Sequence, residues 1–97
     1  MNFFVLVSVS DRQKMFDFAR PGDCVYVNPL SAPGVAVFNA EKRDHWTILA
    51  LDRVYLVIAM IENKVPRRAN TLTVSHSSRV VMTVLCPDCK VRTISVD

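Results

Sequence analysis

The pair Cys86 and Cys89, separated by two residues, is the most specific chemical feature of the sequence. This spacing lets both sulfur atoms bind one tetrahedral metal ion, and Pro87 helps to fix the turn between them. A complete zinc site needs two further ligands, but the sequence has no second pair of this kind. The remaining candidates, whose spacing matches no standard zinc finger, are Cys24, His45 and His76. We therefore expect plain thiols, no metal and no cofactor, and keep zinc as the alternative.

The same residues give little support for catalysis. A redox-active pair normally places a thiolate at a helix N-terminus, whereas Cys86 and Cys89 lie between two predicted strands. The histidines and Cys24 have acidic or hydroxyl neighbours in the sequence, but neighbouring residues of a strand point to opposite faces, so adjacency does not indicate a catalytic group. The only glycines, Gly22 and Gly34, each follow a proline, and no glycine-rich phosphate-binding loop is present. We expect no enzymatic activity.

Basic residues are more frequent in the second half of the chain. The formal net charge is +3, and residues 1–48 contain equal numbers of acidic and basic residues. The positive excess therefore lies beyond residue 48, where two interpretations stay open: an ordinary solvated face, or a surface that binds an anionic partner. The residues that we expect to form such a binding surface are Lys64, Arg67, Arg68, Arg79, Lys90 and Arg92.

Length and composition favour one small β-rich domain over residues 1–97. A chain of 97 residues is too short for two domains that each hold a core. The apolar share of 51% argues against disorder, and sixteen valines, recurring in short runs, suit pleated strands. A domain of this size leaves some apolar surface exposed, so we expect weak self-association.

Local patterns in the first half predict three strands and one helix. Ser10 and Gln13 have the spacing of a capping box, which predicts a helix over residues 11–19. Pro21 and Gly22 are typical of a type II turn, which should end that helix. The strands expected here are 3–9, 24–28 and 35–39.

The second half is read mainly as strands and turns. Residues 45–61 are predicted to form two strands broken near Asp52 and Arg53, and a buried helix stays open as the alternative. Residues 62–70, with Pro66 between basic residues, are expected to be an exposed loop. The remaining expectations are a hairpin of residues 71–75 and 79–85 with its turn at 76–78, and strands over 80–85 and 91–96 on either side of the cysteine pair.

These elements predict a mainly β fold: a small, partly open barrel or a twisted antiparallel sheet of about six strands, with one short N-terminal helix. No stretch resembles a secretion signal or a membrane span, so we expect a cytoplasmic protein. With catalysis set aside, the first hypothesis is a small protein-binding regulator, adaptor or inhibitor that acts through a strand edge and a basic face. Its small size suggests that it is encoded by a phage or virus. The alternatives are a nucleic-acid-binding β-barrel protein and a zinc-supported structural module.

Overall fold

The computed structural model describes residues 1–40, 46–68 and 74–95, with side chains for 1–40, 46–62 and 80–95. These segments contain one α-helix and seven β-strands. No helix among these described segments is long and apolar enough to cross a membrane. In chain order the elements are β1 (Phe3–Leu6), α1 (Val9–Phe18), β2 (Cys24–Val27), β3 (Val37–Asn39), β4 (Trp46–Ile48), β5 (Val54–Arg68), β6 (Val74–Leu85) and β7 (Val91–Ser95).

The seven strands form one sheet in the order β1-β2-β5-β6-β7-β3-β4. The prediction of a mainly β fold with one short N-terminal helix is confirmed, and the sheet is not closed. It has seven strands where about six were expected, and it is mixed, because β1 and β2 are parallel while the other pairs are antiparallel. The parallel pair has a physical reason, since parallel strands need a long crossover and α1 lies in the connection between them.

Helix α1 begins two residues earlier than predicted. Its N-cap is Ser8, whose side chain accepts a hydrogen bond from the backbone N–H of Asp11, while the Asp11 carboxylate accepts one from the backbone N–H of Ser8. The capping box therefore consists of Ser8 and Asp11, and the assignment to Ser10 and Gln13 was wrong. Both pairs have the required spacing, but β1 already ends at Leu6, which leaves Ser8 in the extended conformation of a cap.

The predicted turn after the helix is confirmed. The backbone N–H of Asp23 donates to the carbonyl oxygen of Arg20 at 3.0 Å. Gly22 has a φ of 97°, the left-handed value that a type II turn requires at this position and that glycine adopts without strain. The turn brings the chain into β2 beside β1.

The two-strand interpretation of residues 45–61 is confirmed for the described part, residues 46–61. β4 and β5 flank a turn in which Asp52 has a φ of 59°. The helical alternative is thereby excluded. Residue 45 lies outside the described residues.

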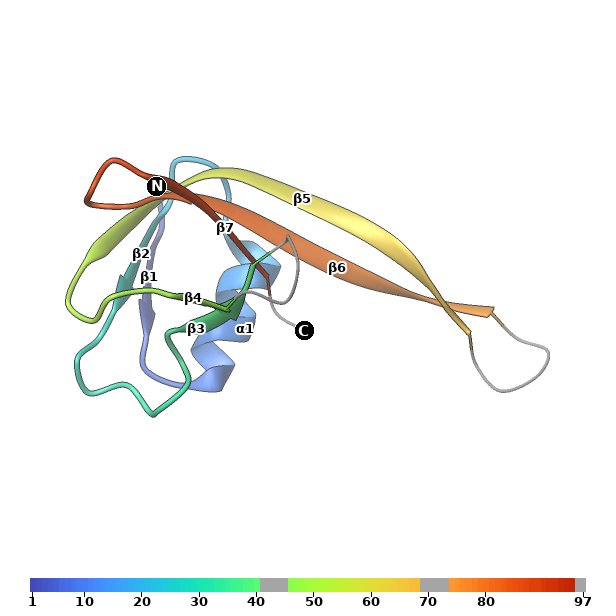
Figure 1. The fold of residues 1–97 in the computed structure, drawn as a ribbon, viewed down its shortest axis with the longest axis horizontal. Coiled ribbons are helices and arrows are strands. Elements are labelled where there is room, and N and C mark those ends of the chain that lie inside the picture. The colour runs from blue at the N-terminus through green and yellow to red at the C-terminus, as the bar shows by residue number, and fades with distance from the viewer. Residues whose placement is uncertain (41–45, 69–73, 96–97) are drawn as a thin grey trace.

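Beyond residue 61 the structure corrects the prediction. β5 continues through the expected loop as far as Arg68, and β6 runs without interruption through the expected turn at residues 76–78. Residues 69–73, where part of the expected loop and hairpin falls, are outside the described residues. Pro66 and the nearby charges favoured a loop, but a two-stranded ribbon has a free edge on each strand, which tolerates a missing N–H group. The ribbon extends away from the rest of the sheet (Figure 1), and the molecule measures 47 × 26 × 25 Å along its principal axes.

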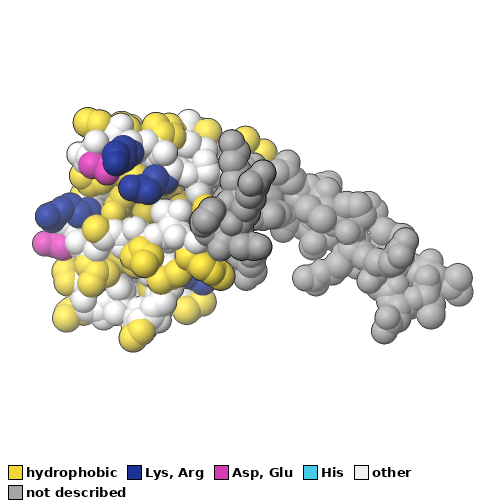
Figure 2. Space-filling model, in the orientation of Figure 1, with side chains coloured by type: hydrophobic (Ala, Val, Ile, Leu, Met, Phe, Trp, Pro, Cys, Tyr) yellow, Lys and Arg dark blue, Asp and Glu magenta, His cyan; other side chains and the backbone are white. Residues whose placement is uncertain are grey.

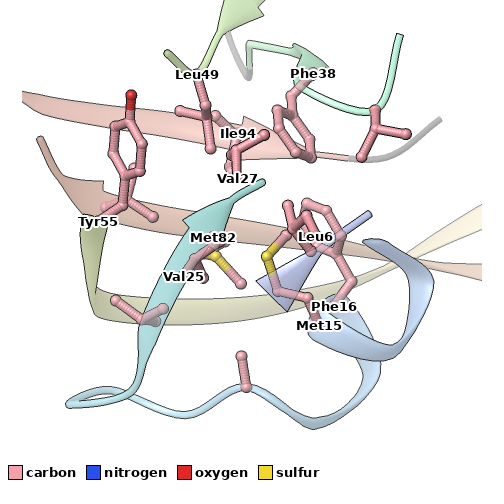
Figure 3. Close-up of a cluster of buried hydrophobic side chains, with 14 of the residues drawn as sticks. Leu6, Met15, Phe16, Val25, Val27, Phe38, Leu49, Tyr55, Met82 and Ile94 are labelled. Atoms are coloured by element: carbon pink, nitrogen blue, oxygen red, sulfur yellow. The ribbon is translucent and has the colours of Figure 1, made fainter. Parts of the chain in front are cut away.

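The hydrophobic core lies between α1 and the inner face of the curved sheet (Figure 3). The helix contributes Met15 and Phe16, and the Phe16 ring lies 6.0 Å from that of Phe38. Arg12 covers this corner: its guanidinium lies over the Phe38 ring and donates hydrogen bonds to backbone carbonyls of Gly34 and Val37. The sheet and its loops contribute fully buried side chains, among them Leu6, Val25, Val27, Leu49, Val57, Met82, Val84 and Ile94.

Candidate functional site

The outer face of the sheet, opposite the core, carries apolar side chains instead of the polar ones that usually face water. In β1 and β2 the inward residues Leu6, Val25 and Val27 are buried, and the residues between them point outward. Two of those outward residues, Phe3 and Val5, are exposed hydrophobic side chains on the edge strand β1. The sheet is thus apolar on both faces in this region.

Strand register aligns five of these outward residues across five adjacent strands. Phe3 pairs with Cys24, Cys24 with Leu56, Leu56 with Leu85, and Leu85 with Val91. Neighbouring strands are about 4.8 Å apart, so the row extends roughly 19 Å across the sheet. Phe3, Leu56 and Val91 are 54%, 37% and 58% exposed.

A second, shorter row widens the apolar surface. Val5 pairs with Tyr26 and Tyr26 with Val54, and the Tyr26 ring lies 6.4 Å from that of Phe3. The Tyr26 hydroxyl donates a 2.7 Å hydrogen bond to Asp52, and this bond raises the pKa of Tyr26. We call the two rows together the outer apolar face; its residues are Phe3, Val5, Cys24, Tyr26, Val54, Leu56, Leu85 and Val91.

None of the eight residues of the outer apolar face is charged, and the Asp52 carboxylate lies at its margin beside Tyr26. On the side of the body that Figure 2 shows, Lys or Arg side chains lie close to Asp or Glu side chains between hydrophobic ones. Sequence reasoning missed the face because only the strand register brings its residues into adjacent rows. The signal was present in segments such as FFVL and CVYV, where both alternating sets of residues are apolar.

The structure places the six predicted basic residues in two groups. Lys64, Arg67 and Arg68 lie on β5 and Arg79 on β6, all in the projecting ribbon. We call this ribbon, formed by residues 63–68 paired with 74–79, the β5–β6 arm.

Lys90 and Arg92 lie elsewhere, at the turn between β6 and β7. Six residues of β6 separate Arg79 from the end of that strand, which corresponds to about 20 Å. Both side chains are exposed, and Arg92 lies 3.9 Å from Asp88 in an ion pair. The turn group is therefore separated from the arm and partly neutralised.

The cysteine pair forms a tight turn between strands, as the sequence predicted. The backbone N–H of Cys89 donates to the carbonyl oxygen of Cys86 at 2.9 Å, and Cys89 has a φ of 63°. Cys86 is buried and Cys89 exposed. Burial raises the pKa of the Cys86 thiol and so favours its protonated form, although Arg92 beside it acts in the opposite direction.

The zinc candidates whose side chains the structure describes do not lie together. Cys24 lies on the outer apolar face, whereas Cys86 belongs to the core cluster and borders a pocket of about 250 Å³ with Tyr55 and Arg92. His45 lies outside the described residues. His76 is opposite Pro66 on the arm, and its side chain is not described. Within the described part of the chain, no three Cys, His, Asp or Glu residues are arranged as metal ligands.

Comparison with protein-family models, with curated proteins and with solved structures finds no match to this chain. Two surfaces of the described residues are candidates for binding, the outer apolar face and the β5–β6 arm.

Proposed function

We propose that this protein acts by binding another protein through its outer apolar face, as a small regulator, adaptor or inhibitor. The observation that carries the proposal is the register-aligned row from Phe3 to Val91, which leaves exposed apolar side chains side by side. Contiguous apolar patches on a soluble domain typically mark interaction sites, whereas single exposed hydrophobic residues do not.

The chemistry of the face defines its partner. Because the face carries no charge, a charged surface placed against it would lose hydration without gaining an ion pair. The matching surface is therefore uncharged and apolar. A second copy of this chain offers such a surface, and two copies can pair through the same patch without electrostatic repulsion.

The size of the face indicates weak binding. Fully burying a Val, Leu or Phe side chain contributes about 1.5–3 kcal/mol, so the half-exposed residues contribute about 1 kcal/mol each. In a dimer each copy contributes five exposed members, Phe3, Val5, Val54, Leu56 and Val91, so the two faces together supply about 10 kcal/mol, against an association cost of about 4–15 kcal/mol. Self-association should accordingly be weak, and a tighter partner must also contact neighbouring features such as the free edge of β1.

Sedimentation of the purified protein over a range of concentrations tests the proposal. We expect the wild type to self-associate at high micromolar concentration, and Val91→Lys to reduce the association constant at least tenfold. Leu30→Lys is the matched control, because Leu30 is 87% exposed and lies outside the face. It should associate like the wild type.

A photo-cross-linking residue at position 91, with position 30 as control, extends the test to other proteins in cells. A discrete adduct from position 91 alone supports protein binding through this face. A wild type that stays monomeric, together with no adduct specific to position 91, would contradict the proposal.

A further inference from the structure

Positive charge in this protein is concentrated in one structural element. Residues 63–79 contain four of the twelve Lys and Arg residues and none of the nine Asp and Glu residues. The rest of the chain has eight basic and nine acidic residues, so it carries a net charge of −1 while residues 63–79 carry +4. The whole positive excess of the protein thus belongs to this segment, whose described residues, 63–68 and 74–79, project from the body (Figure 1).

We propose that the β5–β6 arm binds double-stranded nucleic acid by entering a groove between its two phosphate backbones. This function goes beyond protein binding and does not depend on the outer apolar face. Its basis is the placement of four basic residues at register positions of a projecting two-stranded ribbon.

The register places basic residues on both faces of the ribbon. Lys64 is opposite Ser78 and Arg68 is opposite Val74, on one face. Arg67 is opposite Ser75 and Arg79 is opposite Asn63, on the other. Among the described pairs of β5 and β6, the register shifts only at Val57–Ala59, so the alternation is continuous from Asn63–Arg79 to Arg68–Val74.

Two positive charges on each face fit a ligand that has anionic walls on both sides. A groove of a duplex has this property, because a phosphate backbone runs along each wall. A flat acidic protein surface would meet only one face of the ribbon and leave the charges of the other in water. The distribution therefore favours a groove over a flat acidic surface.

The dimensions and composition of the arm agree with this ligand. The major groove of B-DNA is about 12 Å wide and admits a two-stranded β-ribbon. The paired segment spans five residue steps, or about 17 Å, which covers several phosphates of each strand. The positions paired with the basic residues are neutral, so no carboxylate on the ribbon competes with phosphate.

Fluorescence anisotropy with a labelled random-sequence DNA duplex of about 20 base pairs, two helical turns, tests the proposal on the full chain. Each neutralised phosphate contributes about −0.9 to the slope of log K against log salt, so we expect a slope of up to about −3.6 for four basic residues. Lys64→Gln/Arg68→Gln and Arg67→Gln/Arg79→Gln each remove the charges of one face. Each double variant should bind at least tenfold more weakly in about 50 mM salt and lose about 1.8 from the slope.

The matched control is Arg53→Gln/Lys90→Gln, which removes two exposed charges from the body. Its salt slope should equal that of the wild type, and circular dichroism should show all three variants folded like the wild type. No binding, or equal weakening by the control pair, overturns the proposal. So does weakening by only one of the two arm variants, which would indicate a flat surface. Poly-glutamate or single-stranded DNA that competes as well as the duplex would also overturn it, by showing general anion binding.

Discussion

Asp23 joins three parts of the backbone near the start of β2. Its carboxylate accepts hydrogen bonds from the backbone N–H groups of Asn2 and Arg20, each at 2.9 Å, and its carbonyl oxygen accepts one from the N–H of Val57. These bonds fix the entry into the edge strand β1, on which Phe3 of the outer apolar face lies. The backbone N–H groups of Asn2 and Arg20 lower the pKa of the Asp23 carboxyl below its usual value of 3.8.

Replacing Asp23 with Asn should therefore reduce both stability and its dependence on pH. A carboxyl whose pKa is lowered in the folded state stabilises that state in full above its unfolded pKa, and this contribution is lost as the pH falls through the folded value. We expect Asp23→Asn to lower the free energy of unfolding at neutral pH and to show a smaller further loss between about pH 5 and pH 2 than the wild type. Urea unfolding at a series of pH values measures both effects.

Asp17→Asn is the control for this experiment, since it removes the same charge from an exposed position on α1. If both variants lose equal stability at neutral pH, the backbone hydrogen bonds of Asp23 are not the cause.

At the level of elements, the sequence predicted where most helices and strands lie, but it predicted few of the residues at which they begin and end. The helix, the Pro21-Gly22 turn and the strand break near Asp52 are local, since each depends on neighbouring residues. The length of β5 and β6 is not local, because Pro66 and its charged neighbours favour a loop until β6 is paired with them. The outer apolar face was missed for the same reason: only the register shows that Phe3, Leu56 and Val91 lie in one row.

Substitutions at the N-cap of α1 test directly where this helix begins. Ser8→Ala removes the side chain that accepts a hydrogen bond from the N–H of Asp11, and should lower the free energy of unfolding by about 1 kcal/mol. Ser10→Ala is the matched control, because Ser10 is exposed inside the helix and should change stability by less than about 0.5 kcal/mol. Chemical denaturation measures both variants. A larger loss for Ser10→Ala would restore the capping box that the sequence suggested.

For the whole molecule, the structure separates a nearly neutral body from a basic arm. The sequence showed the positive excess of the second half but grouped Lys90 and Arg92 with the arm residues. Nearness in the sequence could not show that the length of β6 separates Lys90 and Arg92 from the basic residues of the arm. The core that the structure describes is assembled from α1, the inner face of the sheet and its loops in the body, with Met60 and Val80 packed against it near the base of the arm. The body should therefore be able to fold without the arm.

Removing the arm tests this division and separates the two proposals. Glu62 and Val80 are directly paired, so residues 63–79 can be replaced by Asn-Gly, the two residues that a type I′ hairpin turn prefers. We expect a cooperatively unfolding protein whose Tm lies within about 5 °C of the wild type, equivalent to about 1 kcal/mol for a domain of this size. Its net charge falls from +3 to −1, so it should lose duplex binding while it keeps weak self-association through Val91 and its neighbours.

Circular dichroism measures the folding of this variant, anisotropy its duplex binding and sedimentation its self-association. An unfolded product would show that the arm is part of the fold, and loss of self-association in a folded product would place that contact on the arm.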